Sequence, residues 1–517
     1  MSKKIQSSNL KSSILVSFLT VISRITGLIR DIATTAIQGA DVFHDIFIVI
    51  LRIPASLRTF LVEGAFSNAF IPTYSSLIGK NKLNESVAFL NSITFLVLVT
   101  SLLLILISQL FPNFFVLLFA SGYYGDESKL QIASEFNRIM FPYLGFIAMV
   151  SFAGGIQNAN NKFGVPAATP ILFNITLIST AIFAKDFFSV PIYSVVWGVL
   201  LAGILQLIIQ IKPLLKLKIR LRPVFTRNLD SIKNFKSLFM PSLVIGALMQ
   251  INIVVDTIFS TFLEEGSPTW LYLSQRLMQL PLGIFAMALS TVLLPHLSKL
   301  FASNNEKNFS NSLKQSLRIV LFVGLPSMIG LSILAEEIIS TIFLRGEFAY
   351  MDVYKTSYSL IILSIALPFL MIQRVLQPAF FARLDTRAPL IISFLSVGAN
   401  IIMNYFLAFY LGLGHLGIAG GFLVAALISA IGFIYVLYKK NLISANYLFN
   451  QKNFVIIIIS LLLATFLFYA SQNIAFSEIS LASKIVVLFS MILSSVLIYI
   501  TLAYIFGLRL KDFKSNN

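Results

Sequence analysis

Two consecutive segments near the start of the chain decide how the rest of it is interpreted. Residues 23–31 read S-R-I-T-G-L-I-R-D, and residues 45–75 read D-I-F-I-V-I-L-R-I-P-A-S-L-R-T-F-L-V-E-G-A-F-S-N-A-F-I-P-T-Y-S. Both are apolar enough to enter a bilayer, yet they carry four interior arginines: Arg24, Arg30, Arg52 and Arg58. A charge at the bilayer centre costs roughly 2.5–3.5 kcal/mol, so four cost on the order of 10–14 kcal/mol. Arginines this costly indicate a binding role.

The spacing of the arginines predicts where they meet. If the two segments are antiparallel neighbours, residues whose numbers have a constant sum lie at equal depth. Arg24 matches Arg58 in this way. Arg30 matches Arg52 with the same sum. The sequence therefore predicts two layers of two guanidinium groups.

Nearby acids leave two interpretations open. Asp31, Asp45 and Glu63 are plausible ion-pair partners, which would make the arginines purely structural. Three carboxylates cannot neutralise four arginines, however, and Arg276 occurs later in a similar setting. The remaining positive charge suits a dianion such as a diphosphate, and this anion site is the interpretation that we favour.

Composition defines the class of protein. The chain has 517 residues, of which 57% are hydrophobic and 11% are charged, whereas a soluble domain has about 25% charged residues. We therefore predict an all-α polytopic membrane protein. The formal net charge of +17 falls almost wholly in one set of loops, so it indicates membrane topology and not nucleic-acid binding. The absence of cysteine excludes disulfides and thiolate metal sites.

Hydropathy predicts about fourteen transmembrane helices, each needing about 20 mostly apolar residues. Basic residues concentrate in alternate loops, and both ends of the chain fall on that side, so we expect both termini on the cytoplasmic side of the membrane. The predicted spans are 10–38, 41–72, 84–110, 131–156, 165–184, 190–211, 234–262, 268–300, 309–335, 353–383, 387–411, 417–438, 452–471 and 481–507.

Weak internal similarity predicts two lobes of six helices. F-I-P-T-Y-S-S-L at 70–77 recurs as L-L-P-H-L-S-K-L at 293–300, and Asn174-Ile175 recurs as Asn400-Ile401. Such halves are related by an axis along the membrane normal and enclose a central cationic cavity. The predicted division comprises an N-terminal lobe, a basic cytoplasmic loop, a C-terminal lobe, and two extra helices with a cytoplasmic tail: 1–215, 216–236, 237–440 and 441–517.

The second lobe contributes further polar residues inside spans. Arg276 and Gln279 lie three residues apart in span 268–300 and are expected to join the substrate site. Asp256, Asn400 and Asn404 supply oxygen atoms that suit Na⁺. The alternative, which we favour from the residues alone, is that the asparagines are interhelical hydrogen-bond partners and that Asp256 pairs with an arginine.

Nothing in the sequence indicates an enzyme. His44, His296 and His415 are isolated and show no metal-ligand spacing. A P-loop and a nucleophile elbow are also lacking, so ATP hydrolysis is not encoded. We expect no cofactor, and expect Na⁺, another ion gradient, the membrane potential or the substrate gradient to supply the energy.

Three motifs carry a family resemblance. S-R-I-T-G-L-I-R-D, the E-G-A-F-S-N-A-F-I-P box and Q-R-L-M-Q-L-P resemble the MurJ (MviN) family of bacterial lipid II flippases, in the MOP exporter superfamily. The resemblance spans essentially the whole chain. It implies that lipid II, an undecaprenyl diphosphate with the peptidoglycan disaccharide-pentapeptide, moves from the inner to the outer leaflet. It also implies cavity roles for matching residues: Arg24, Arg30, Arg52, Arg276, Asp31, Asp45 and Glu63.

The resemblance further implies a groove for the lipid tail along spans 452–471 and 481–507, and a sodium site at Asp256 and Asn400. This chain has Gln279 where some relatives have Glu, and Asn404 where an Asp occurs.

We expect a monomer, with the cell-wall synthesis machinery as a partner. Alternatives are a flippase for another polyprenyl-diphosphate oligosaccharide, a cation antiporter, a membrane-embedded peptidoglycan polymerase and a scaffold protein.

Overall fold

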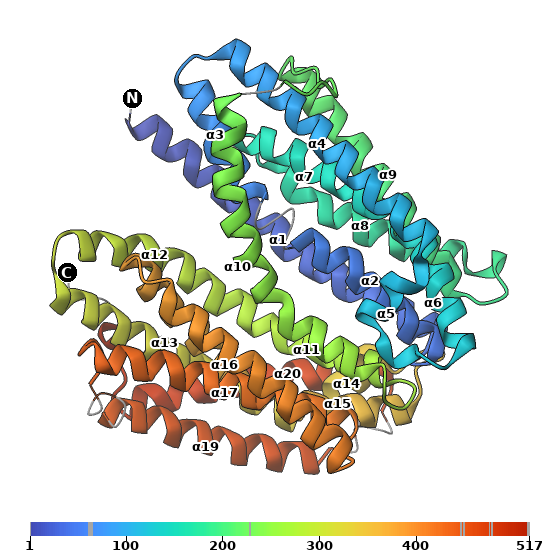
Figure 1. Ribbon diagram of the computed structural model, residues 1–517. Coiled ribbons are helices and arrows are strands. Elements are labelled where there is room, and N and C mark those ends of the chain that lie inside the picture. Colours follow the sequence, from blue (N-terminus) through green and yellow to red (C-terminus); the bar gives the residue numbers. More distant parts are fainter. Residues whose placement is uncertain are drawn as a thin grey trace. The chain divides into compact units, whose positions relative to one another are not determined.

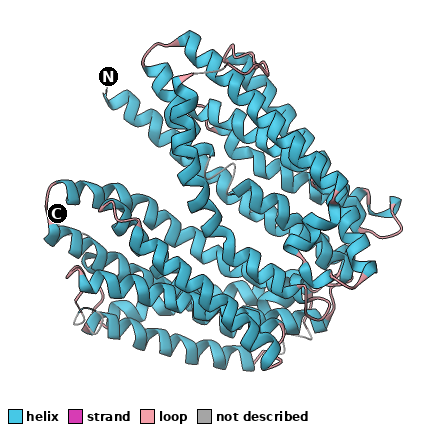
Figure 2. Cartoon of the chain, in the orientation of Figure 1, coloured by secondary structure: helices cyan, strands magenta, loops and turns pink. Residues whose placement is uncertain are grey.

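The computed structural model describes residues 2–59, 66–226, 229–444, 447, 450–474, 476 and 479–513. Within these residues every regular element is a helix (Figure 2). Contacts divide the chain into two compact units. Unit 1 comprises Met1–Pro268 with Arg345–Phe348, and unit 2 comprises Thr269–Leu344 with Ala349–Asn517.

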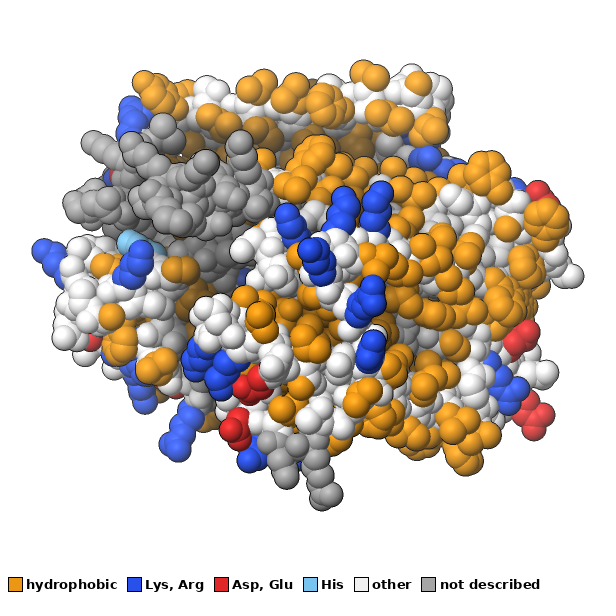
Figure 3. All heavy atoms as spheres, turned by 90° about the horizontal axis from the view of Figure 1, so that it is seen from above, with side chains coloured by type: hydrophobic (Ala, Val, Ile, Leu, Met, Phe, Trp, Pro, Cys, Tyr) orange, Lys and Arg blue, Asp and Glu red, His pale blue; other side chains and the backbone are white. Residues whose placement is uncertain are grey.

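Eleven helices of the described chain are long and apolar enough to cross a membrane. Their outer faces carry large exposed apolar side chains, such as Leu102 and Leu106 in unit 1 and Val486 and Phe489 in unit 2. Apolar side chains also cover much of the face drawn in Figure 3, where lysine and arginine side chains gather among them. Exposed apolar surface on this scale is the surface that lipid covers. The chain is therefore an all-α membrane protein, as predicted.

Three predicted spans are not among those eleven helices. Span 10–38 lies within α1 (Ser2–Gln38), and span 234–262 corresponds to α10 (Asp230–Ser260). Span 41–72 corresponds to α2 (Val42–Leu57) followed by α3 (Ser67–Gly79). The described part of α2 stops at Leu57, and the structure resumes as α3 at Ser67. The count of fourteen spans therefore stays a prediction for these three.

Unit 1 is built from ten helices of the described chain. Helix α1 packs against α8, α8 against α9, and α3 against α10, and Figure 1 shows α4, α7, α8 and α9 running alongside one another. The helices are α1 (Ser2–Gln38), α2 (Val42–Leu57), α3 (Ser67–Gly79), α4 (Leu83–Leu110), α5 (Pro112–Phe119), α6 (Glu127–Met140), α7 (Tyr143–Ala159), α8 (Gly164–Phe183), α9 (Ile192–Lys216) and α10 (Asp230–Ser260).

Local sequence explains where α1 ends and α2 begins. Gly39 has a φ of +72°, a conformation that favours glycine and ends α1. Asp41 then caps α2, because its side chain accepts a hydrogen bond from the backbone N–H of His44 at 2.9 Å. This short turn brings the arginine-bearing helices α1 and α2 one after the other.

Unit 2 contains the remaining long helices. Helix α15 packs against α13 and α17, α16 packs against α17, and α19 contacts both α13 and α20. A π-helical turn at Leu282–Ala286 follows α11, and another at Tyr405–Tyr410 follows α16. The helices are α11 (Ser267–Pro281), which begins at the unit boundary, α12 (Met287–Ala302), α13 (Glu306–Ile333), α14 (Ala335–Phe343), α15 (Tyr350–Ala382), α16 (Arg387–Asn404), α17 (His415–Lys439), α19 (Gln451–Gln472) and α20 (Leu481–Ile505).

The division by contacts places α10 in unit 1. It packs there through Phe235, which joins an aromatic core with Phe66, Phe70, Phe89 and Phe152. The predicted lobes 1–215 and 237–440 were defined by an internal repeat, which the division by contacts does not test. Those lobes and their pseudo-symmetry stay a prediction.

Candidate substrate site

The predicted substrate residues lie on three helices. Helices α1 and α2, with the residue that follows α2, carry six of them in unit 1, and α11 carries two in unit 2. Glu63 lies outside the described residues. The six are Arg24, Arg30, Asp31, Asp45, Arg52 and Arg58, and the two are Arg276 and Gln279.

Arg30 is the most closely defined of these residues, and only 8% of it is exposed. Its Nε and Nη2 atoms donate to Asp31 Oδ1 at 3.0 and 2.5 Å. Its Nη1 donates to Asn174 Oδ1 on α8 at 3.3 Å. Hydrogen bonds to an ionised group are the strong ones, so the guanidinium is held in one orientation between α1 and α8.

Asn174 also binds α1 through its other amide atom. Its Nδ2 donates to the backbone oxygen of Ser23 at 3.1 Å and to Thr26 Oγ1 at 3.2 Å. One carboxamide therefore fastens α8 to α1 and orients Arg30. In the sequence, Asn174 stood out only as part of the internal repeat. An amide within an apolar span was the available signal, since polar residues there usually hydrogen-bond across helices.

Arg52 contacts α10. Its Nη1 donates to Thr257 Oγ1 at 2.5 Å, and that hydroxyl in turn donates to the backbone oxygen of Ile253 at 2.6 Å. Arg52 is half-buried, whereas Thr257 is buried. Thr257, which the sequence analysis did not single out, thus positions a predicted substrate residue.

Asp45 is held by backbone. It is 4% exposed, and its Oδ2 accepts a hydrogen bond from the N–H of Gly266 at 2.6 Å. Gly266 has a φ of +90° in the turn after α10. The carboxylate therefore ties the beginning of α2 to that turn, a role that sequence patterns did not indicate because the two residues are far apart in the chain.

The other predicted cations are half-buried. Arg24 lies on α1, six residues before Arg30, and Arg58 directly follows α2. In unit 2, Arg276 is half-buried on α11, and Gln279 is exposed on the same helix. The predicted pairing of Arg24 with Arg58 and of Arg30 with Arg52 stays a prediction.

The residues proposed for sodium fall in both units. Asn400 and Asn404 are fully buried on α16, and Asn404 Nδ2 donates to Asn400 Oδ1 at 3.5 Å. Asp256, only 1% exposed, belongs to α10 in unit 1. The described residues contain no group of three or more His, Cys, Asp or Glu side chains placed to hold a metal. The sodium site therefore stays a prediction.

These side chains are suited to binding an anion. A guanidinium donates to phosphate oxygens in a planar, often bidentate arrangement and stays charged when buried. Arg30 is already oriented by Asp31 and Asn174, and Arg52 by Thr257, so little side-chain freedom is left to lose on binding. Charged side chains within membrane spans usually face the interior of the helix bundle, where they mark substrate pathways, and not the lipid.

Solved structures of known transporters share the fold of this chain. A multidrug resistance MATE family transporter of the MOP superfamily, in an inward-facing conformation, has a TM-score of 0.65 at 14% identity. The match covers 83% of this chain and 94% of that chain. An outward-facing MATE transporter gives a TM-score of 0.54. At this identity the likeness shows the fold alone: the chain has the fold of a polytopic membrane transporter.

The family follows from closer matches. The family profile of lipid II flippase MurJ matches residues 34–505. The probable lipid II flippase MurJ of Vibrio cholerae is 32% identical, over 98% of each chain. The lipid II flippase MurJ of Burkholderia cenocepacia is 28% identical over 83% of each chain. A structure of lipid II flippase MurJ in an inward closed conformation has a TM-score of 0.77 and 29% identity, covering 95% of this chain and 98% of that one.

This chain belongs to the MurJ family of lipid II flippases. It is therefore a transporter of peptidoglycan synthesis and not an enzyme, as the absence of catalytic motifs predicted. The resemblance inferred from the arginine-bearing segments and the E-G-A-F-S box is confirmed.

Proposed function

We propose that this chain moves lipid II from the inner to the outer leaflet of a bacterial cytoplasmic membrane by alternating access. Membership of the MurJ family supports the substrate, and the buried arginine on α1 supports the way in which the headgroup is held. The observation that carries this proposal is that Arg30 is buried and fixed by Asp31 and Asn174.

The diphosphate is the part of the substrate that the arginines grip. Arg24, Arg30 and Arg52 of unit 1 bind it together with Arg276 of unit 2, and Arg58 and Gln279 line its path. A diphosphate offers several oxygens to guanidinium groups, and each charge-assisted contact is about twice as strong as a neutral hydrogen bond. Substrate binding then neutralises repulsion among the cations and favours the transition to the outward-open state.

The acids limit repulsion when no substrate is bound. Asp31 neutralises part of the charge on Arg30 through the two hydrogen bonds to its Oδ1 atom. Asp45 keeps the first turn of α2 in place through its bond to Gly266. Glu63, outside the described residues, is expected to serve the same purpose.

The polyprenyl tail stays in lipid along α19 and α20.

The topology and the energy source complete the proposal. Basic loops on one side place both termini in the cytoplasm. The chain acts as a monomer beside the machinery of cell-wall synthesis. Sodium bound at Asp256, Asn400 and Asn404, or the membrane potential, resets the transporter.

Reconstituted vesicles test the headgroup grip. Purified wild-type protein should move labelled lipid II across the bilayer without consuming it. Arg24→Ala and Arg276→Ala should reduce this rate by at least tenfold, because each loses a charge-assisted contact worth about 1.5–3 kcal/mol. Arg138→Ala is the matched control, since Arg138 is exposed at the end of α6.

Normal transport by both arginine variants would contradict the proposal. Transport of another polyprenyl-diphosphate oligosaccharide at the same rate would indicate the broader substrate class. Conversion of lipid II to polymer would support the alternative of a polymerase.

A further inference from the structure

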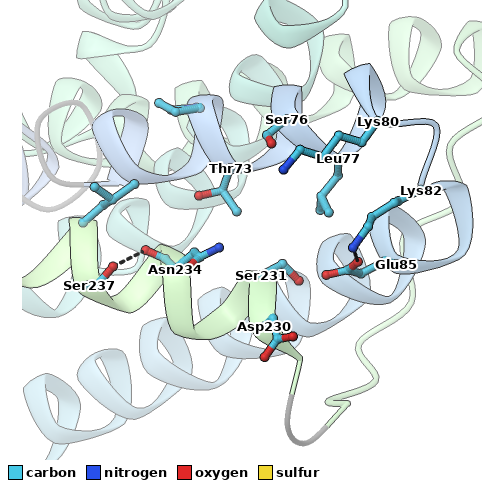
Figure 4. Close-up of a pocket in the computed structure, with 12 residues that line it drawn as sticks. Thr73, Ser76, Leu77, Lys80, Lys82, Glu85, Asp230, Ser231, Asn234 and Ser237 are labelled. Carbon is cyan, nitrogen blue, oxygen red and sulfur yellow. Dashed lines mark hydrogen bonds and ion pairs between the residues drawn. The ribbon is translucent and has the colours of Figure 1, made fainter.

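A cavity of about 330 Å³ lies in unit 1 where α3 ends and α4 and α10 begin (Figure 4). Its volume is at the lower end of the range for small-molecule sites. None of the predicted substrate arginines lines it. The lining residues are Pro72, Thr73, Ser76, Leu77, Lys80, Lys82, Glu85, Asp230, Ser231, Asn234, Ser237 and Leu238.

Two lysines and two acids line this cavity, and three of these four charges lie in ion pairs. Lys82 and Glu85 form an ion pair at 2.9 Å. The Asp230 side chain is 87% exposed and lies 3.4 Å from Lys233, which does not line the cavity. Among the described residues, Lys80 is the lining cation that forms no ion pair with an acid. In Figure 4 its amino group is drawn on the side of α3 that faces α10.

Hydrogen-bond donors also converge on this space from two helices. Ser76 lies on α3, and Ser231 and Asn234 lie on the first turns of α10 (Figure 4). The Thr73 hydroxyl already donates to the backbone oxygen of Ala69 at 2.8 Å. A lysine with hydroxyl and amide donors suits the oxygens of a phosphate group.

Ser231 supplies an independent observation. It is only 2% exposed, and its Oγ atom has no hydrogen-bond partner among the described residues. A buried hydroxyl without a partner costs about 1–3 kcal/mol. Ser231 also lines the cavity, so rotation of its side chain would let this hydroxyl donate to a ligand there.

We propose that this cavity is a phosphate-ester site, in which Lys80, Ser231 and Asn234 bind the phosphate. The loop that contains Lys80 and Lys82 is one of the basic loops expected at the cytoplasmic face. Phospholipid headgroups and soluble phosphates both reach that face, and they share the group that the cavity recognises. The site is separate from the arginines that grip the transported lipid.

Ligand binding to the full-length protein tests this site. The probes are inorganic phosphate, a short-chain phosphatidylglycerol and, as a phosphate-free control, the matching diacylglycerol. The measurements are adducts in native mass spectrometry and the rise in the unfolding midpoint in detergent. Wild-type protein should bind at least one phosphate-bearing probe and should not respond to diacylglycerol.

Two variants should weaken binding at least tenfold, namely Lys80→Gln and Ser231→Ala. Lys236→Gln is the matched control, because Lys236 is an exposed lysine on α10 that does not line the cavity. Without ligand, Ser231→Ala should unfold at or above the wild-type temperature, because it removes a buried hydroxyl that has no partner in the described part of the chain.

The outcomes distinguish a lipid headgroup from a free phosphate as the ligand, and loss of this site from loss of transport. Binding of inorganic phosphate that competes with the lipid indicates that the phosphate group alone suffices, whereas binding of the lipid alone indicates a headgroup site. The proposal would be overturned if neither probe bound, or if both variants bound as tightly as the wild type. A lower ligand-free unfolding midpoint for Ser231→Ala than for the wild type would also overturn it. Arg24→Ala should bind these probes normally, so loss of transport and loss of this site are distinguishable.

Discussion

Arg30 illustrates how a helical membrane protein keeps a cation buried. Removing a charge from water is costly unless an opposite charge and further hydrogen bonds replace the lost hydration. Asp31 provides the charge and Asn174 provides the third hydrogen bond, while the Phe173 ring lies 6.0 Å from the guanidinium carbon. The partner on α8 matters as much as the adjacent acid, because it fixes where the guanidinium points.

Gly421 in unit 2 lies where α17 packs closely against Asn404 of α16. A Cβ atom at this position would lie 2.0 Å from Asn404 Oδ1, so α17 approaches α16 as closely as a bare Cα allows. Gly421→Ala should lower the free energy of unfolding by about 1–3 kcal/mol, the usual cost of overpacking. Denaturant unfolding in detergent measures this loss.

Gly398 is the matched control for that substitution. It lies on α16, the helix that Gly421 packs against, and a Cβ there would meet nothing within 4 Å. Gly398→Ala should leave stability unchanged or raise it by up to about 1 kcal/mol, because alanine is the better helix former. Equal losses for the two variants would show that the close approach of α17 to α16 does not limit residue 421.

At the scale of elements, one ion pair links two helices of unit 2. Asp385 lies in the turn between α15 and α16, and Lys440 directly follows α17. Lys440 Nζ donates to Asp385 Oδ2 at 2.5 Å, and the backbone N–H of Ala388 donates to Asp385 Oδ1 at 3.2 Å. The hydrogen bond from Lys440 holds the pKa of Asp385 below its usual value, against the smaller opposing effect of burial.

This shift predicts how stability changes with pH. A carboxyl group whose pKa is lower in the folded chain contributes stability above its unfolded pKa, about 3.9 for Asp, and loses it as pH falls through the folded pKa. The wild-type unfolding midpoint should therefore fall more steeply between about pH 5 and pH 3 than that of Asp385→Asn. Thermal unfolding at both pH values measures the difference.

Lys440→Gln tests whether the lysine causes this shift. It should remove most of the same pH-dependent contribution, and the double variant should lose little more than either single variant. An unchanged pH profile in Lys440→Gln would assign the low pKa to the Ala388 N–H alone.

At the scale of the whole molecule, the orientation in the membrane is the property that transport depends on most. The chain contains no cysteine, so a single introduced thiol reports its own side of the membrane. Asn84 at the start of α4 and Glu127 at the start of α6 are both exposed and lie at opposite ends of the span Leu83–Leu110 along the chain. The basic loop before α4 predicts that Asn84 is cytoplasmic and Glu127 is outside.

Thiol labelling in intact cells measures this orientation. A membrane-impermeant reagent should label Glu127→Cys at once, and Asn84→Cys only after permeabilisation. The reverse pattern would invert the topology and, with it, the direction of transport that we propose. Equal labelling of both positions would contradict the assignment of α4 as a span.

Much of the fold could be predicted from the sequence because hydropathy is a local property. The long apolar runs predicted spans 309–335 and 353–383, and the structure has α13 at Glu306–Ile333 and α15 at Tyr350–Ala382. Span 131–156 corresponds to two helices, α6 and α7, which meet at Phe141-Pro142. The overall hydropathy of that run did not indicate the junction, although the proline was visible.

Only the charged residues of the site could be predicted from the sequence. A charge within an apolar segment is conspicuous at any distance along the chain, so Arg30 and Asp45 stood out from the sequence. Their partners did not, since Asn174 and Gly266 are ordinary residues far away in sequence.

The sequence by itself thus determined that the chain is a helical membrane protein, because apolar length and charge within a span are properties of consecutive residues. Three short motifs carried its resemblance to the MurJ family. Only the tertiary structure decided which groups hold those charges. Asn174 reaches Arg30 and Thr257 reaches Arg52 because helices distant in sequence pack side by side. The Ser231 hydroxyl, which has no hydrogen-bond partner in the part of the chain that the structure describes, is likewise a consequence of packing, since burial belongs to the folded chain and not to the residue.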